Sequence, residues 1–281
     1  MAKHVVCITF DFDAVSGFIA KGLTSPTPVS RGEFGAVAVP RILELLHRFG
    51  ISSTWFIPGH TLETYPSQCR LVSEGGHEIA HHGWTHIPPN EMTCEEEERD
   101  LIRGNDAIRK LTGRAARGYR SPSWDLSPHS VELLLKHGFL YDSSMMGNDY
   151  SPYRVRKGDV ITLQQSMKFG KPTSLIELPV SWSLDDFPHF EFLRTKNSVL
   201  PGLMDADGVL ANWLGDYEYM RRHLPSGMLT YTFHPFVIGR GHRMILLEKL
   251  LQRLLEAGAQ FATMEEAAVD YARHNPYKED Q

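Results

Sequence analysis

The stretch HEIAHHGWTH, residues 77 to 86, holds four histidines and one glutamate in ten positions. These histidines can be paired in two ways, and the two pairings predict different folds. His77 and His81 frame an H-E-x-x-H pattern, the helical signature of zinc proteases in which the glutamate acts as the base. His82 and His86 instead form an H-x-x-x-H pair that needs no helix. The residues around this stretch therefore decide the fold.

The neighbouring residues do not support a helix. Two glycines directly before the stretch are a helix stop signal, and HEIA alternates as a strand does. In a strand, the two histidines of the protease signature would not stack as they do one helical turn apart. The longer protease signature, H-E-x-x-H-x-x-G-x-x-H, also fails, because Gly83 and His86 come one residue too early. We therefore expect a strand at 77–80, followed by a loop that carries the H-x-x-x-H pair.

Strand-like apolar runs alternate with helical patterns along most of the chain. Apolar residues recur at three- and four-residue spacing in 39–49 and 244–258, as they do in helices. The main strand-like runs are at 5–10, 53–57, 77–80, 174–180 and 228–233. This alternation is typical of an α/β protein with a parallel sheet or barrel. The intervals 143–173 and 183–215 have no sustained period, and long insertions of this kind usually belong to the functional face.

Length and composition limit the classes of function. The 281 residues contain no internal repeat or linker, so we expect a single catalytic domain over 1–281, with a core at about 5–265 and a frayed C-terminal tail. The net charge of −5 and the absence of a Lys/Arg block argue against nucleic acid or an anionic membrane as a partner, and favour a small-molecule substrate. With no visible secretion signal, no long apolar run and no C-x-x-C pair among the three cysteines, we expect a cytoplasmic location.

The loop after the strand at 77–80 can supply part of a metal site. His82 and His86 follow a strand end, where barrel enzymes place their functional residues. The first strand ends in TFDFDA, and its Asp11 and Asp13 are two residues apart, so they lie on the same face of an extended segment. One carboxylate can then bind the cation while the other acts as a general base towards a metal-bound water. A shell of two histidines and one aspartate leaves positions open for that water and for a substrate carbonyl.

Four short motifs carry a resemblance to a known family. TFDFDA, HHGWTH, RSPSWD and TFHP occur in the order and approximate spacing of the motifs of the polysaccharide deacetylase family, also called NodB-homology proteins. That resemblance implies a distorted parallel (β/α) barrel of about seven strands. It also implies a metal-dependent hydrolase of non-peptide amide C–N bonds. The match extends from about residue 5 to about residue 265.

The resemblance assigns a role to each residue that matches a motif. Asp11 resembles the general base, and Arg120 looks like the residue that orients it. His234 resembles the general acid that protonates the leaving nitrogen, with Asp185 or Asp186 as its carboxylate partner; Asp186 is preferred. Asp13, His82 and His86 resemble the metal ligands of the family. Such a set of ligands accepts zinc, cobalt, iron or nickel. We expect a divalent metal ion, and zinc is the preferred candidate.

Several segments resemble one subgroup of the family more than the common sugar deacetylases. Phe12 separates two aspartates that are adjacent in those enzymes, and the SRGEFG and DDFP segments are similar to allantoinase-like, cyclic-imide-hydrolysing and peptidoglycan-deacetylase-like members. We therefore favour a small cyclic amide or imide as the substrate. The alternative substrate is an N-acetylated sugar or peptidoglycan, and the non-enzymatic alternative is a degenerate ligand-binding barrel. The subgroup also suggests a homo-oligomer, a dimer or tetramer.

Aromatic residues inside or beside the motifs can form the walls of a compact pocket. We expect them to bind substrate: Trp84, Trp124, Trp182 and Phe236. Arg240, in IGRGHR, either binds a carboxylate of the substrate or supports its own loop, and the sequence does not choose between these roles.

Overall fold

The computed structural model describes residues 4–194 and 199–278. Its main feature is a nine-stranded sheet in the order β10-β1-β2-β3-β4-β5-β7-β6, with β11 paired to β1 beside this path. All pairs are parallel except the pair of β6 with β7. The strands are β1 (His4–Asp11), β2 (Thr54–Ile57), β3 (Glu78–His81), β4 (Gly118–Tyr119), β5 (Tyr141–Asp142), β6 (Tyr153–Lys157), β7 (Lys171–Glu177), β10 (Gly227–Phe233) and β11 (Gln260–Phe261).

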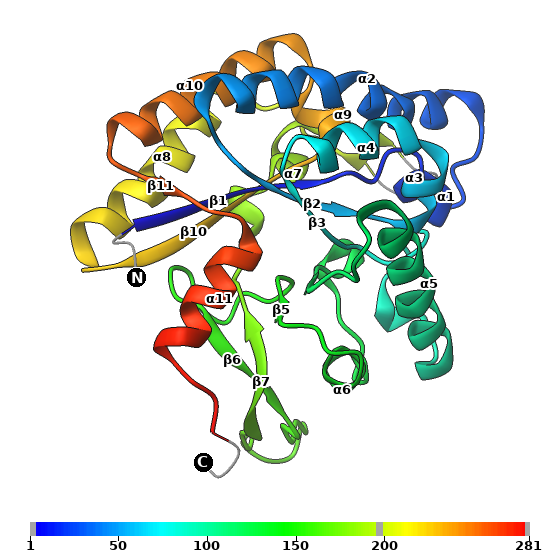
Figure 1. Ribbon diagram of the computed structural model, residues 1–281, viewed down its shortest axis with the longest axis vertical. Helices are drawn as coiled ribbons and strands as arrows, with labels where there is room; N and C mark the ends of the chain where they lie inside the picture. Colours follow the sequence, from blue (N-terminus) through cyan, green and yellow to red (C-terminus); the bar gives the residue numbers. More distant parts are fainter. Residues whose placement is uncertain (1–3, 195–198, 279–281) are drawn as a thin grey trace.

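Seven parallel strands, β10 through β7, curl into a half-barrel (Figure 1). A single parallel bridge between Asp185 and Thr232 brings the chain that follows β7 back towards β10. A short separate hairpin, β8 (Leu193–Arg194) with β9 (Val199–Leu200), lies outside this sheet. The expected distorted parallel barrel of about seven strands is confirmed.

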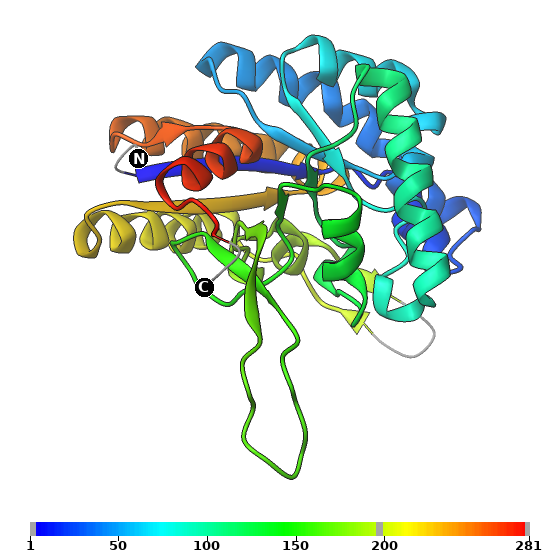
Figure 2. The same ribbon diagram turned by 60° about the horizontal axis from the view of Figure 1, so that its bottom comes forward.

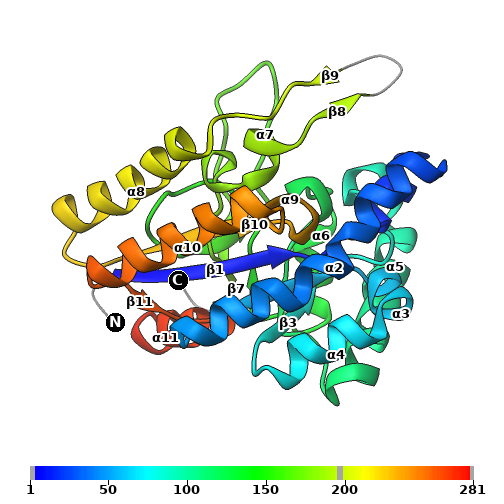
Figure 3. The same cartoon turned by 90° about the horizontal axis from the view of Figure 1, so that it is seen from above.

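Helices cover the outside of the half-barrel, and α2, α8 and α10 run beside β1 and β10 (Figure 3). Capping boxes open α5 and α11, where Thr93 and Thr263 accept from the backbone of Glu96 and Glu266. The helices are α1 (Ser16–Ala20), α2 (Pro26–Phe49), α3 (Gly59–Thr64), α4 (Pro66–Glu74), α5 (Cys94–Thr112), α6 (Ser130–Lys136), α7 (Asp186–Phe190), α8 (Ala206–His223), α9 (Pro235–Ile238), α10 (Gly241–Glu256) and α11 (Met264–His274), with short 3₁₀ turns at Pro89–Glu91, Pro122–Trp124 and Trp182–Leu184. None of the described helices is both long and apolar enough to cross a membrane.

Alternation along β1 directs its last carboxylate into the barrel. Val6, Ile8 and Phe10 belong to the large core cluster between the sheet and its helices. Cys7 belongs to a second cluster, which fills the barrel interior together with residues of β2, β3, β5 and β7. Because strand side chains alternate between faces, Asp11 shares the interior face with Cys7 and lies at the carboxyl end of the strand.

Several segments differ from the sequence-based expectation or add detail to it. Helix α2 begins at Pro26 and not near residue 39, and α8 occupies 206–223, within and beyond an interval without a clear period. Helix α11 packs Met264 and Ala268 against the barrel interior. The interval 143–173 contains β6 and a projecting hairpin connection between β6 and β7 (Figure 2).

Candidate active site

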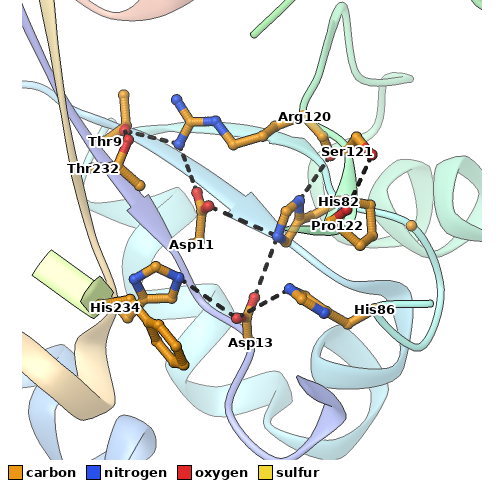
Figure 4. Close-up of polar contacts among 12 residues, drawn as sticks. Thr9, Asp11, Asp13, His82, His86, Arg120, Ser121, Pro122, Thr232 and His234 are labelled. Atoms are coloured by element: carbon orange, nitrogen blue, oxygen red, sulfur yellow. Dashed lines mark hydrogen bonds and ion pairs between the residues drawn. The ribbon is translucent and has the colours of Figure 1, made fainter. Parts of the chain in front are cut away.

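The carboxyl ends of β1, β3, β4 and β10 bring the motif residues to one cavity (Figure 4). Asp11 ends β1 and Asp13 follows it, while His82 and His86 follow β3. Arg120 comes directly after β4, and His234 directly after β10. The sequence-based grouping of these six residues matches their placement in the structure. All six are at least nine-tenths buried.

Asp13, His82 and His86 form a cluster with the spacing of metal ligands. His82 Nε2 lies 3.4 Å from Asp13 Oδ1, and His86 Nε2 lies 3.3 Å from Asp13 Oδ2. Two ligands bound at about 2.1 Å to a tetrahedral zinc ion lie about 3.4 Å apart, so the observed separations fit such an ion. His82 Nδ1 donates to the carbonyl oxygen of Arg120 at 2.8 Å, which leaves Nε2 as the lone-pair nitrogen.

Three polar atoms of this cluster lack hydrogen-bond partners within the described part of the chain. Asp13 Oδ1, His82 Nε2 and His86 Nδ1 are all buried and unpaired. Burial opposes ionisation of Asp13, but the charges of the two histidines hold the pKa of its carboxyl well below the usual range. His86 also has a positive φ of 62°, which is uncommon for a residue other than glycine and often occurs at functional sites. A cation held by Asp13 Oδ1, His82 Nε2 and His86 Nε2 would satisfy two of these three atoms, since His86 faces Asp13 through Nε2.

Arg120 holds Asp11 in place. Its Nη1 donates to Asp11 Oδ1 at 2.7 Å and to Thr9 Oγ1 at 2.9 Å. Its other nitrogens donate to the carbonyl and hydroxyl of Ser143, both at 3.1 Å, and the guanidinium lies 4.0 Å above the ring of Phe56. Asp11 Oδ2 is left 3.8 Å from His82 Nε2, on the side of the metal-type cluster. One carboxylate oxygen is therefore fixed and the other faces the cavity.

His234 stands on the opposite side and is bound to an aspartate. Its Nδ1 lies 2.8 Å from Asp186 Oδ1, and its backbone N–H also donates to Asp186. Asp185 is 3.5 Å from the same ring nitrogen and caps α7 through the N–H of Phe187. Although burial lowers the pKa of His234, the charge of Asp185 and the bond to Asp186 raise it to about 10. His234 Nε2 points towards Asp13 Oδ2, at 3.8 Å.

Aromatic side chains surround these polar groups in a cavity of about 110 Å³. Trp124 and Trp182 stack with ring centroids 4.2 Å apart, and they line the cavity together with Phe236. Sequence reasoning missed Phe18, Lys21, Phe187 and Glu191, which also line it. The position of Phe187 beside Asp186 was the one available signal for this group.

Trp84 does not line the cavity, contrary to the expected substrate-binding role. Its ring packs against Gly59, where an added Cβ would be 2.3 Å from a ring carbon, and the Arg103 guanidinium lies 3.5 Å above it. The close approach of the Gly59 backbone directs the indole to a different surface hollow, beside Arg103. Trp84 is therefore a packing residue of this loop.

His77 and His81, the two histidines of the protease-type pattern, have structural roles. His81 points away from the cavity: its Nε2 donates to the carbonyl of Leu101 and its Nδ1 accepts from Gly83 N, each at 3.1 Å. Burial lowers the pKa of His81 to about 3. His77 accepts from the N–H of Ser53, and burial lowers its pKa to about 4. Both residues therefore stay neutral and structural, as the strand interpretation requires.

Comparison with known proteins places this site in a family. The polysaccharide deacetylase family model matches residues 1–141. The peptidoglycan deacetylase of Helicobacter pylori is 36% identical over 99% of this chain and 100% of its own length. The chain belongs to the polysaccharide deacetylase family. A peptidoglycan deacetylase-like protein of Gibberella zeae is 31% identical over 95% of this chain and 86% of its own.

Solved structures of the polysaccharide deacetylase type share the whole fold. A crystal structure from Mycobacterium smegmatis, provisionally assigned to these deacetylases, superposes with a TM-score of 0.86 and 31% identity over 99% of this chain and 93% of its own. An allantoinase structure superposes with a TM-score of 0.76 over the same shares, at 20% identity, which supports the fold alone. The chain is therefore a deacetylase-type hydrolase of C–N bonds. Deacetylases of this family depend on a metal ion, and the Asp13, His82 and His86 cluster fits one.

Proposed function

We propose that this chain removes the N-acetyl group from an N-acetylated sugar of the peptidoglycan type. We further propose that Asp13, His82 and His86 bind a divalent metal ion, with zinc as the preferred candidate. The central observation is the set of unpaired buried atoms in that cluster, flanked by an arginine-held carboxylate and a histidine–aspartate pair. The full-length similarity to a peptidoglycan deacetylase favours this substrate over the cyclic imide expected from the sequence.

The reaction needs a base on one side of the amide and an acid on the other. When bound, the cation polarises the amide carbonyl and lowers the pKa of the attacking water. Asp11 accepts the proton of that water through its free Oδ2, while Arg120 keeps Oδ1 fixed. His234 then donates the proton on Nε2 to the leaving nitrogen, because an amine anion is a poor leaving group. Asp186 holds the imidazolium through Nδ1, and the raised pKa of His234 keeps it protonated at neutral pH.

A small cyclic imide is a second candidate substrate, favoured by the shape of the cavity. The volume of about 110 Å³ and the stacked Trp124–Trp182 wall suit a compact planar ring better than a long polymer. Attack on such a ring would open it to a half-amide, with the same base and acid. Trp182 is 43% exposed, so this wall also forms the edge of the cavity.

One experiment separates the two candidates. Purified protein, stripped of metal and reloaded with zinc, is assayed with an N-acetylglucosamine oligomer and with succinimide. Asp11→Asn is the inactive variant, and Asp207→Asn, the same charge change at an exposed position, is its control. We expect zinc-dependent and Asp11-dependent acetate release. Ring opening of succinimide without acetate release would contradict the sugar as the substrate and support the cyclic imide. If neither substrate is hydrolysed, both candidate functions are contradicted.

A further inference from the structure

A second cavity adjoins the reaction cavity and has mostly basic polar walls. The two cavities share Glu191 and Phe236. The basic residues of the second cavity come from α2 and from the beginning of α10: Arg31, Arg240, His242 and Arg243. Glu191 is its one acidic lining residue within the described part of the chain. A group that extends out of the reaction cavity past Phe236 would therefore meet a positive surface.

The beginning of α10 has an unusual charge for a helix N-terminus. Arg240 is its N-cap and makes no capping hydrogen bond through its side chain, and the first turn contains no acid. His242 and Arg243 follow within that turn. Free N–H groups and the helix dipole already make this end positive, so added cations are unfavourable unless an anion is present. By contrast, α5 and α11 begin with capping boxes and glutamates.

The charges of this group are only partly neutralised within the described residues. Arg31 forms an ion pair with Glu191. No carboxylate of the described chain lies within ion-pair distance of Arg240, whose guanidinium stacks 3.5 Å from the ring of Phe34. Stacking leaves the N–H groups at the edge of a guanidinium free to donate. Burial and the charge of Arg240 both lower the pKa of Arg31, as expected for neighbouring cations.

Arg243 adds a buried donor without a partner. It is only 7% exposed, and its two terminal nitrogens donate to the carbonyls of Val237 and Phe190, both at 3.0 Å. Its Nε has no partner in the described structure, although the residue lines the cavity. An unpaired buried donor of a charged group is costly, and an anion in the cavity would remove that cost.

We propose that this cavity is a subsite for a carboxylate of the substrate, occupied while the amide lies between Asp11 and His234. The inference rests on the proposed function and narrows its substrate class to acylated amines that carry a carboxylate a few bonds from the amide. A planar carboxylate matches the fork of donors on Arg240 and the positive end of the α10 dipole. When no such carboxylate is bound, Arg31 forms its ion pair with Glu191, which lies in the wall shared by the two cavities.

The test compares two substrates that differ in one charge: N-acetylmuramic acid and its methyl ester, with zinc-loaded enzyme. We expect the acid to have a KM roughly tenfold or more below that of the ester, since one charge-assisted contact has about that effect. Arg240→Gln should remove this advantage, and Arg240→Lys should keep part of it. Arg253→Gln, at the other end of α10, is the matched control and should behave as the unchanged enzyme.

A binding measurement separates the subsite from the chemistry. Calorimetry with zinc-loaded Asp11→Asn records the affinity for the acid and for the ester without turnover. Preference for the acid that depends on Arg240, with no turnover in the active enzyme, would support the subsite and contradict the proposed function. Turnover of both compounds without such a preference would support the proposed function and contradict the subsite. Equal behaviour of acid and ester in both turnover and binding overturns the subsite.

Discussion

Two groups of aspartates and histidines face the same cavity, and they differ in what their polar atoms contact. Donor spacing alone would allow a metal in either group: Asp13, His82 and His86, or Asp185, Asp186 and His234. In the first group, one atom of each residue is buried without a partner in the described structure. In the second group, the ring and the backbone of His234 both bond to Asp186.

This difference separates a site for a cation from a site for a proton. Buried lone pairs on Asp13 and His82 that have no partner, with His86 Nε2 beside them, fit a positive ion that is not part of the chain. A histidine already bonded to a carboxylate has its charge compensated and can keep and release a proton. The same residue types therefore serve two purposes, and hydrogen-bond satisfaction distinguishes them better than spacing does. Three measurements test this distinction, and a fourth concerns a buried acid pair elsewhere in the fold.

The largest effect is expected at the metal-type group. His82→Ala should abolish binding of the zinc ion and lower kcat/KM on the order of 10⁴-fold, because a metal supplies several kcal/mol of transition-state stabilisation. Metal content per chain and hydrolysis of the preferred substrate are measured together. His223→Ala, which removes an exposed histidine, is the control. One full equivalent of zinc in His82→Ala would instead indicate that the ion binds at Asp185, Asp186 and His234. That result would contradict the assignment of the first group as the cation site.

A smaller effect is expected at the proton-type group. His234→Asn should retain its zinc and lower kcat about 10³-fold, since a positioned general acid contributes about 10²–10⁴-fold. The same metal analysis and assay apply. A substrate with a better leaving group should recover part of the lost rate, because it needs less protonation. Loss of zinc in this variant would show that His234 belongs to the cation site.

The pH dependence of activity sharpens the distinction further. An acid must be protonated, so activity should fall as the pH rises through the pKa of His234, which its neighbours raise to about 10. Asp186→Asn removes the bonded charge and should move this alkaline limb to lower pH. A cation bound beside Asp13 also lowers the limb, because Asp13 contributes to the raised pKa. The measurement is kcat against pH for both proteins; coincident alkaline limbs would exclude His234 as the acid.

The smallest effect concerns a buried acid pair away from the cavity. Burial raises the pKa of Asp142 to about 6, and it raises the pKa of Glu177 well above its usual value. A carboxyl whose pKa is raised by folding stabilises the fold below its unfolded pKa, near 4, and loses that contribution as the pH rises through the folded pKa. The free energy of unfolding should therefore decrease between pH 5 and pH 8, by about 1–3 kcal/mol.

Glu177→Gln tests this assignment. The amide cannot ionise, so urea unfolding of the variant should depend less on pH over the same interval, while its zinc content stays unchanged. Equal pH dependence in both proteins would assign the effect to other groups.

The sequence predicted the polar site better than its aromatic walls. Asp11, Asp13, His82 and His86 were found because strand ends of a parallel sheet meet at one edge, and their spacing determines the face. The direction of Trp84 depends on Gly59, a residue of another loop that packs against it, which no local pattern reveals. A residue's place within a motif therefore predicted its neighbourhood, but not the direction of a loop side chain.

Helix α2 shows why some elements could not be predicted. Its first half contains two prolines and two glycines, and apolar spacing is clear only from about residue 39. The glycines are needed for packing: an added Cβ at Gly32 would be 2.5 Å from the carbonyl oxygen of Ala14. Tertiary contact with the loop after β1 therefore stabilises a helix that local propensity disfavours.

The position of β1 also has a consequence for folding during synthesis. His4–Asp11 is the first strand made, yet seven of its residues pair with β10 at 227–233, and β11 pairs beside it. Met264 and Ala268 of α11 complete the interior cluster to which Cys7 belongs. Because these contacts join the two ends of the chain, the sheet cannot close until the C-terminal part has left the ribosome. Until then, the edge of β1 that pairs with β10 has no partner strand.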